Sequence, residues 1–261
     1  MSGSWKKQMV LVWASQFLSI MGFSFALPFV AFFLQKDLGV TRPTEVRMWV
    51  ALFSASTAVT MAVAAPLWGL LADRYGKRIM LIRANLAGAL VMSLMGAAHT
   101  AGMLIVLRLL QGALTGTMTA AQAFLAGEMP HERRGLAVGG LSAAVFSGSM
   151  AGAPLGGFVA EWLGYRLAFA VSGALLLAAG LLVLCCTRET VVPTVRSRVP
   201  EGIPESARPH WRDLSSAFYG VLALIGAIAF VRQSDLAFLP LLVQDIHGTL
   251  DRAALWSGAL N

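Results

Sequence analysis

The chain alternates between long apolar runs and short polar segments, a pattern typical of a protein that crosses a membrane several times. A helix needs about 20 mostly apolar residues to cross the hydrocarbon core. Seven runs meet this length, at roughly 9–34, 48–72, 79–98, 103–126, 136–160, 167–186 and 214–243, and an eighth begins near Ala253. The first run is longer than the ~7–15-residue core of a secretory signal peptide, so we expect it to be retained as a span.

The longest polar segment, 187–213, divides the chain. It holds four of the ten prolines together with several charges, and such stretches are typical of linkers. We therefore expect an N-terminal six-helix transmembrane bundle at 1–186, a cytoplasmic linker at 187–213, and the incomplete start of a second bundle at 214–261.

The 20 lysines and arginines are concentrated in alternate loops. If the N-terminus is inside, thirteen lie on the cytoplasmic side, five lie outside, and Arg108 and Arg232 lie within spans. The cytoplasmic set is Lys6, Lys7, Arg74, Lys77, Arg78, Arg83, Arg133, Arg134, Arg188, Arg196, Arg198, Arg208 and Arg212, and the outside set is Lys36, Arg42, Arg47, Arg166 and Arg252. Because positive loops stay inside, this bias predicts a multi-pass membrane protein with a cytoplasmic N-terminus.

Composition excludes several classes of protein. The chain is 57% hydrophobic and only 13% charged, about half the charged fraction of a soluble chain, so a soluble enzyme and a disordered chain are both excluded. The net charge of +7 is spread over short loops rather than along a basic stripe, so we expect no nucleic-acid partner. The only cysteines, Cys185 and Cys186, are neighbours and are expected to be small buried hydrophobes.

An internal repeat lies at an offset of 88 residues. The pattern P-x2-G-x2-A-[DE]-x2-G-x-R occurs first as Pro66, Gly69, Ala72, Asp73, Gly76 and Arg78, and again as Pro154, Gly157, Ala160, Glu161, Gly164 and Arg166. Three spans separate the copies, so they must lie on opposite membrane faces. This is the inverted-topology repeat of many secondary transporters, although short glycine and proline matches also arise by chance.

The loop after the second span reads Gly69-Leu-Leu-Ala-Asp73-Arg74-Tyr75-Gly76-Lys77-Arg78. Glycine permits close helix approach and tight turns, and by composition alone this is an ordinary basic cytoplasmic loop. It resembles, however, the G-x3-D-[RK]-x-G-[RK]-[RK] signature of the major facilitator superfamily at every fixed position. The resemblance implies that Gly69, Asp73, Arg74, Gly76, Lys77 and Arg78 form a cytoplasmic gate motif.

The fourth span carries Arg108, Gln111 and Gly112, which resemble the R-x2-Q-G motif of the same superfamily. An arginine at mid-span costs about 2.5–3.5 kcal/mol on insertion scales, so it normally faces a cavity or a partner. Gln111 lies three residues on and shares its helix face. We expect a cavity-lining pair; the alternative is a structural arginine bonded to carbonyls of a neighbouring helix.

The fifth span is rich in glycine. Its residues Gly139, Gly148, Gly152, Pro154, Gly156 and Gly157 resemble the antiporter motif of the superfamily, with the proline one residue later than usual. The resemblance implies a thin helix face that packs against the other bundle and blocks leakage. In this respect the chain is most similar to bacterial drug:proton antiporters of the multidrug efflux type.

One acid within the predicted spans is a candidate for carrying a proton. Asp235 is the only acid well inside any span, and Arg232 lies three residues before it, so it is either a proton carrier or half of a local ion pair. The first span has no acid, and proton coupling is therefore what the resemblance implies. Its aromatic residues are expected to be packed or lipid-facing; an aromatic wall for amphipathic compounds is the alternative. They are Trp13, Phe17, Phe25, Phe29 and Phe32.

Other membrane classes fit less well. The four histidines lie in loops or at span ends, and no H-E-x-x-H motif occurs, so we expect neither an enzyme, nor a metal site, nor a cofactor. A retinal protein needs a lysine in its seventh span, and the last lysine is Lys77. A channel would favour a charged ring or a filter loop, and neither is visible.

These observations predict an all-α integral membrane protein of the major facilitator fold: a six-helix bundle of two inverted three-helix repeats, a seventh helix and the start of an eighth. We expect a secondary transporter in the plasma (bacterial inner) membrane that exports small amphipathic compounds, drawing on a proton gradient. Its partners would be substrate, protons, lipids and the missing C-terminal half. A non-transporting fragment or scaffold, or a facilitator of another solute such as a sugar, is the alternative.

Overall fold

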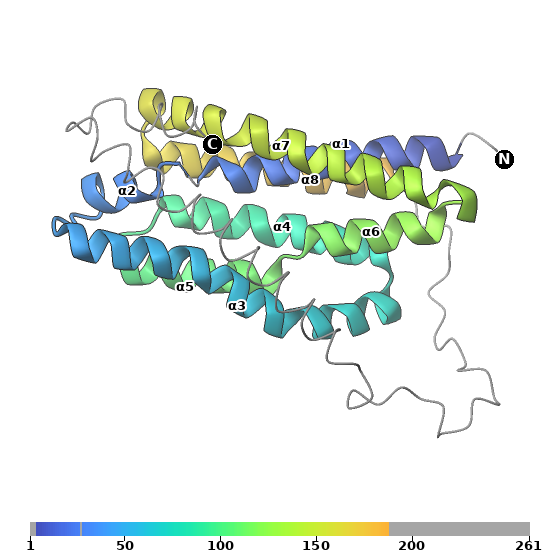
Figure 1. The fold of residues 1–261 in the computed structure, drawn as a ribbon, viewed down its shortest axis with the longest axis horizontal. Coiled ribbons are helices and arrows are strands. Elements are labelled where there is room, and N and C mark those ends of the chain that lie inside the picture. Colours follow the sequence, from blue (N-terminus) through green and yellow to red (C-terminus); the bar gives the residue numbers. More distant parts are fainter. Residues whose placement is uncertain (1–3, 27, 188–261) are drawn as a thin grey trace, which may run out of the picture.

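A computed structural model describes residues 4–26 and 28–187, which form a bundle of helices with no strand in these ranges (Figure 1). The α-helices are α1 Ser4–Phe25, α2 Val30–Lys36, α3 Pro43–Tyr75, α4 Lys77–Gly96, α5 Ala101–Leu114, α6 Thr117–Glu128, α7 Arg134–Leu163 and α8 Tyr165–Cys186. A short 3-10 turn at His131–Arg133 precedes α7.

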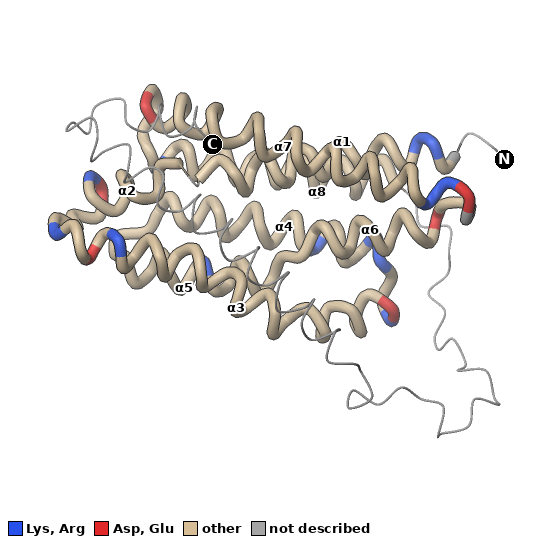
Figure 2. Tube along the Cα trace, in the orientation of Figure 1, with Lys and Arg blue, Asp and Glu red and all other residues tan. Residues whose placement is uncertain are grey.

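Six helical stretches in this part of the chain are long and apolar enough to cross a membrane. They correspond to the first six predicted spans, and the all-helical class is confirmed. Figure 2 shows the charged residues concentrated at the two ends of the bundle, as expected if water borders both ends. The predicted linker beyond Thr187, the seventh span and the start of the eighth lie outside the described residues.

Two of the six spans are not continuous helices. In the first, α1 ends at Phe25 and α2 begins at Val30, with Pro28 between them, and proline has no N–H to continue the helix ladder. In the fourth, α5 and α6 are separated by Thr115 and Gly116. Gly116 has a φ of +127°, a backbone conformation that side chains with a Cβ rarely adopt. The span predicted at 103–126 is therefore present, but it consists of two helices.

The helices pack chiefly in pairs: α4 on α8, α1 on both α7 and α8, and α3 on α5. Aromatic rings pack against one another where the start of α2 meets α8. The ring centroid of Phe169 lies 5.1 Å from that of Phe29 and 5.2 Å from that of Phe33, both edge to face, the arrangement that aromatic pairs prefer. Phe25, Phe29 and Phe32 are all buried, in keeping with the packed role expected for them.

The end of α8 differs from expectation. Cys185 and Cys186 are both exposed, so the expectation that they are buried is wrong. Val183 and Thr187 are the residues that turn inward here, with 0% and 1% exposed surface. An apolar span leaves one stripe free of protein contacts, and the two cysteines lie on that stripe.

The inverted repeat is visible in the backbone. Gly76 ends α3 and begins α4 with a φ of +97°, and Gly164 ends α7 and begins α8 with a φ of +85°. Both turns need glycine for the same reason, a positive φ. A proline also lies inside each preceding long helix, Pro66 in α3 and Pro154 in α7.

Two arginines of the repeat make equivalent bonds. Arg78, at the start of α4, donates to the carbonyl of Leu184 at the end of α8 over 2.6 Å. Arg166, at the start of α8, donates to the carbonyl of Gly96 at the end of α4 over 3.0 Å. The two donors are 88 residues apart, which is the offset of the repeat, and the two acceptors are also 88 residues apart. Each cation thus lies at the negative C-terminal end of the other's helix, and α4 and α8 run antiparallel.

This symmetry predicts that Arg78→Met and Arg166→Met have similar effects on stability. Each variant loses the charge-assisted bond to a helix end and at least one further polar contact, which joins Arg78 to the Thr187 hydroxyl and Arg166 to Asp37. Because both sites are partly exposed, we expect about 1–2 kcal/mol of destabilisation from each. Thermal unfolding of the purified protein in detergent measures it. Arg42→Met is the control, because Arg42 pairs only over 3.3 Å with Glu45 at an exposed helix end. A large loss in one variant and none in the other would show that the two contacts are not equivalent.

Candidate functional site

The site begins with Arg108 in α5, which is 7% exposed. Its Nη1 donates to Gln111 Oε1 over 2.6 Å, and its Nε donates to the carbonyl of Phe53 in α3 over 3.3 Å. Its guanidinium carbon lies 4.2 Å from the centre of the Phe53 ring, within cation–π range. The structure thus joins Arg108 to Gln111, and it also shows the carbonyl bond to a neighbouring helix that the alternative interpretation required.

Gln111 extends this contact to a third helix. It is 2% exposed, and its Nε2 lies 3.6 Å from the sulfur of Met92 in α4. Gly112 brings α5 close to α3, because a Cβ there would overlap the Thr57 carbonyl and the Thr60 hydroxyl. The Arg108–Gln111 pair is therefore enclosed between α3, α4 and α5.

The gate motif is divided by the structure. Gly69, Asp73 and Arg74 are exposed at the end of α3, and no atom of the described chain lies within 4 Å of a Cβ built on Gly69. Gly76 makes the predicted turn, and Lys77 is half-buried beside it. Arg78 faces the bundle, with bonds to Leu184 and to the Thr187 hydroxyl of α8. The open part of the motif therefore comprises Gly69, Asp73 and Arg74.

The glycines of α7 mostly face inward, toward α1. A Cβ at Gly148 would lie 2.7 Å from the Phe17 carbonyl, a Cβ at Gly152 would lie 2.5 Å from the Met21 carbonyl, and one at Gly156 would meet the Phe25 carbonyl. The expectation that these three form a face for another bundle is wrong. Their spacing of four residues instead lets α7 lie directly on the α1 backbone.

The rest of that motif is arranged differently. Gly139 and Pro154 are exposed, and nothing lies within 4 Å of a Cβ built on Gly139. Gly157 is buried beside Gly156. Only Gly139 and Pro154 thus remain available to a partner outside this bundle.

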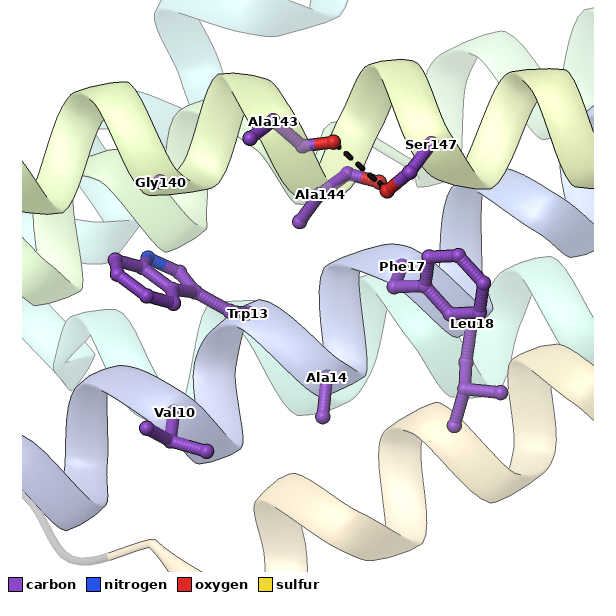
Figure 3. Close-up of a pocket in the computed structure, with 9 residues that line it drawn as sticks. All are labelled: Val10, Trp13, Ala14, Phe17, Leu18, Gly140, Ala143, Ala144 and Ser147. Atoms are coloured by element: carbon purple, nitrogen blue, oxygen red, sulfur yellow. Dashed lines mark hydrogen bonds between the residues drawn. The ribbon is translucent and has the colours of Figure 1, made fainter.

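An open apolar groove of about 680 Å³ runs between α1 and α7. Figure 3 shows Trp13 and Phe17 of α1 lying beside the α7 residues around Gly140 and Ser147. The lining is Val10, Trp13, Ala14, Phe17, Leu18, Gly140, Ala143, Ala144 and Ser147, none of which is charged. Trp13 and Phe17 thus line a groove, which sequence reasoning offered only as the alternative.

Two side chains that sequence reasoning did not place in the site meet at the helix break. Arg83 was counted among the cytoplasmic loop charges, yet it lies within the α4 span and its Nη1 donates to the Leu114 carbonyl over 2.7 Å. Trp68 of α3 donates from its indole N–H to the Ala113 carbonyl over 2.5 Å. The sequence did indicate that Arg83 lies within a span, because it falls inside the apolar run at 79–98.

Asp235 lies outside the described residues. Within residues 4–187, no group of three or more His, Cys, Asp or Glu side chains could hold a metal ion.

Six span-length helices with an internal repeat and an intramembrane arginine are typical of one half of a secondary transporter. The chain belongs to the Major Facilitator Superfamily, because residues 12–260 match the sequence model of that family. This is a family of multi-pass membrane transporters rather than enzymes.

Among curated proteins, the chain is similar to several that are named multidrug resistance protein MdtG. It is 33% identical over 260 residues to the one from Klebsiella pneumoniae (strain 342), covering 98% of this chain and 61% of the relative. It is 30% identical over 263 residues to the one from Escherichia coli O6:K15:H31, covering 98% of this chain and 62% of the relative. The chain thus spans about three fifths of the length of these relatives.

Solved structures agree on the fold. A bacterial homologue of the human lysosomal transporter Spinster, in an inward-facing and unoccupied conformation, matches with a TM-score of 0.78 at 17% identity, covering 100% of this chain and 60% of that one. A D-xylose–proton symporter matches with a TM-score of 0.64 at 15% identity, covering 96% of this chain and 64% of that one. At such identities the likeness establishes the architecture alone.

Proposed function

We propose that this chain is part of a secondary transporter that exports small amphipathic compounds by alternating access, driven by protons. The observation that carries the proposal is the groove between α1 and α7. It is wide, open and apolar, with two aromatic side chains and no charge, which suits ligands of varied shape that share an apolar body. Similarity to proteins named for multidrug resistance supports the same substrate class.

The residues divide into three roles under this proposal. Asp73 and Arg74, with Gly69, form the exposed part of a cytoplasmic gate, while Gly76, Lys77 and Arg78 hold the junction from α3 to α4. Arg108 and Gln111, backed by Gly112, are the polar centre of the transport path. The third role, moving protons, falls to Asp235, which lies in the family match.

The setting of the protein completes the proposal. The charge bias of the loops supports a cytoplasmic N-terminus, and the bacterial relatives support the inner membrane. Substrate, protons and lipids are the partners, and the second half of the transporter is needed for function. Within the glycine-rich motif of α7, Gly139 and Pro154 are the exposed positions and so are available for contact with that half.

The side chains that line the groove favour amphipathic compounds over a sugar. Sugars are bound through several hydrogen bonds to their hydroxyls, whereas the only polar side chains of the groove are Trp13 and Ser147. Both already donate within the bundle, Trp13 to the Ala137 carbonyl over 3.3 Å and Ser147 to the Ala143 carbonyl over 2.8 Å. The groove therefore offers a sugar few free polar partners.

The test is an efflux measurement with ethidium, an aromatic cation, in bacteria that lack their own drug pumps. Cells that produce the full natural protein containing this chain should accumulate several-fold less ethidium, and a protonophore should remove the difference. Ser147→Trp fills the groove and should lower efflux, whereas Leu181→Trp, on the exposed stripe of α8, should not. Equal accumulation with and without the protein would contradict export and favour a scaffold.

A further inference from the structure

The break between α5 and α6 lies at the meeting point of three helices. The last carbonyls of α5 have no partner within their own helix. Those of Ala113 and Leu114 accept bonds from Trp68 of α3 and Arg83 of α4. The guanidinium carbon of Arg83 also lies 3.4 Å from the centre of the Trp68 ring. We name Trp68, Arg83 and these two carbonyls the break cluster.

Each member of the break cluster compensates for the cost of another. A backbone carbonyl without a partner costs several kcal/mol inside a membrane, and an arginine there is expensive as well. The bond from Arg83 Nη1 to Leu114 gives the carbonyl a partner and pairs one nitrogen of the guanidinium, while the buried Nε of Arg83 has no hydrogen-bond partner within the described residues. The cation also lies at the negative end of the α5 dipole, and it rests on an aromatic face, which stabilises a desolvated cation further.

The two half-helices share contact with α4 but differ in their other neighbours. α5 packs mainly on α3, whereas α6 packs on α4, α1 and α7. The strained backbone of Gly116 permits the break, but a glycine permits many conformations and selects none. The break cluster selects one of these conformations, because it fixes where α5 ends relative to α3 and α4.

We infer that Arg83, together with Trp68, is a positioning residue of the transport site. Arg83 binds Leu114 at the far end of α5, the half-helix that carries Arg108 and Gln111. Leu114 is six residues from Arg108, or about 9 Å at 1.5 Å per residue. A helix is stiff over that length, so holding its end fixes the height and rotation of the Arg108–Gln111 pair. This inference deepens the proposed function and depends on it only for the transport assay below.

The first test measures ethidium export by the full natural protein, with the amount in the membrane determined for each variant. Arg83→Met keeps the length of the side chain but loses the cation and its bonds, and should lower Vmax/KM about tenfold, equal to about 1.4 kcal/mol. Arg83→Lys keeps a donor and a charge, so it should retain most of the parent's Vmax/KM. Trp68→Phe loses the bond to Ala113 but keeps an aromatic ring, so its Vmax/KM should lie between those of the two Arg83 variants.

A double-mutant cycle separates positioning from general stability. If Arg83 acts through the pair, Arg83→Met should add little to the loss caused by Gln111→Leu. In the background of Ser147→Trp, in the groove between α1 and α7, the losses should multiply. Multiplied losses in both backgrounds would overturn the inference. If Arg83→Met does not reach the membrane, Trp68→Phe takes its place in the same cycle with the same criterion.

A second test does not use transport, so it decides the inference even if the full protein exports nothing. Spin labels at Val106 of α5 and Ala126 of α6, both exposed, report the distance across the break after Cys185 and Cys186 are replaced by serine. One narrow distribution is expected for the parent and for Arg83→Lys, and a broadened or second distance for Arg83→Met. An unchanged distribution in Arg83→Met would overturn the positioning role.

Discussion

Replacing Arg108 by methionine should abolish ethidium export by the full natural protein, with a loss of at least about 100-fold. The guanidinium is buried and bonded to Gln111 and to the Phe53 carbonyl. Each hydrogen bond to a buried charged group is worth about 1.5–3 kcal/mol, so losing both bonds from the guanidinium corresponds to more than a hundredfold in rate if both persist in the transport step. Initial export rates, divided by the amount of protein in the membrane, measure the effect.

Arg108→Lys should fail almost as completely. A lysine keeps the charge, but it lacks the planar fork that reaches Gln111 and Phe53 at once. Arg42→Met serves as the control for loss of a positive charge at an exposed position and should export normally. Normal export by a well-folded Arg108→Met variant would show that this arginine only ties α5 to α3 and has no part in transport.

The second large effect is expected at Gly152, where leucine should prevent the bundle from forming. A Cβ at this position would lie 2.5 Å from the Met21 carbonyl and 2.9 Å from the Ser24 Cβ, so α1 and α7 must separate. Overpacking costs ~1–3 kcal/mol even where a core can adjust, and backbone atoms adjust less than side chains. The readouts are the amount of protein in the membrane and its unfolding temperature in detergent.

Gly139→Leu is the matched control, since it lies on the same helix and has nothing within 4 Å. It should accumulate like the parent. If Gly152→Leu reached the membrane in normal amounts with an unchanged unfolding temperature, the close approach of α1 and α7 would be disproved. A defect of Gly139→Leu confined to export would instead support contact between this part of α7 and a second bundle.

The glycines of α7 illustrate what a motif conveys. Their spacing of four, at Gly148, Gly152 and Gly156, indicates one smooth helix face and can be read directly from the chain. The identity of the helix that lies on that face cannot be read this way, because spacing describes one helix only. The structure places α1 there, with Phe17, Met21 and Phe25 at the same spacing.

The break in the fourth span escaped prediction for a physical reason. Apolar composition continues through Thr115 and Gly116, and a single glycine within a helix costs only about 1 kcal/mol relative to alanine. Glycine therefore permits both a continuous and a broken helix. Side chains from α3 and α4 decide between them, and these belong to distant parts of the chain.

The candidate site was predictable to different degrees. Arg108 and Gln111 are three residues apart, so one helical turn brings them together and the sequence alone indicates the pair. Arg83 was misplaced because its charge was counted with the nearby loop. Its bond to Leu114 connects residues 31 positions apart, and such a contact depends on how α4 crosses the end of α5.

Local order in the sequence was enough to specify six apolar stretches of spanning length, the repeat itself, and the turns at Gly76 and Gly164 of that repeat. These follow from hydropathy, periodicity and backbone stereochemistry within a few neighbouring residues. Only the tertiary structure decided which helices touch, that Arg78 bonds the end of α8 while Arg166 bonds the end of α4, and where the fourth span breaks. Those features depend on hydrogen-bonding groups far apart in the chain, which find each other only when the helices pack and water is excluded.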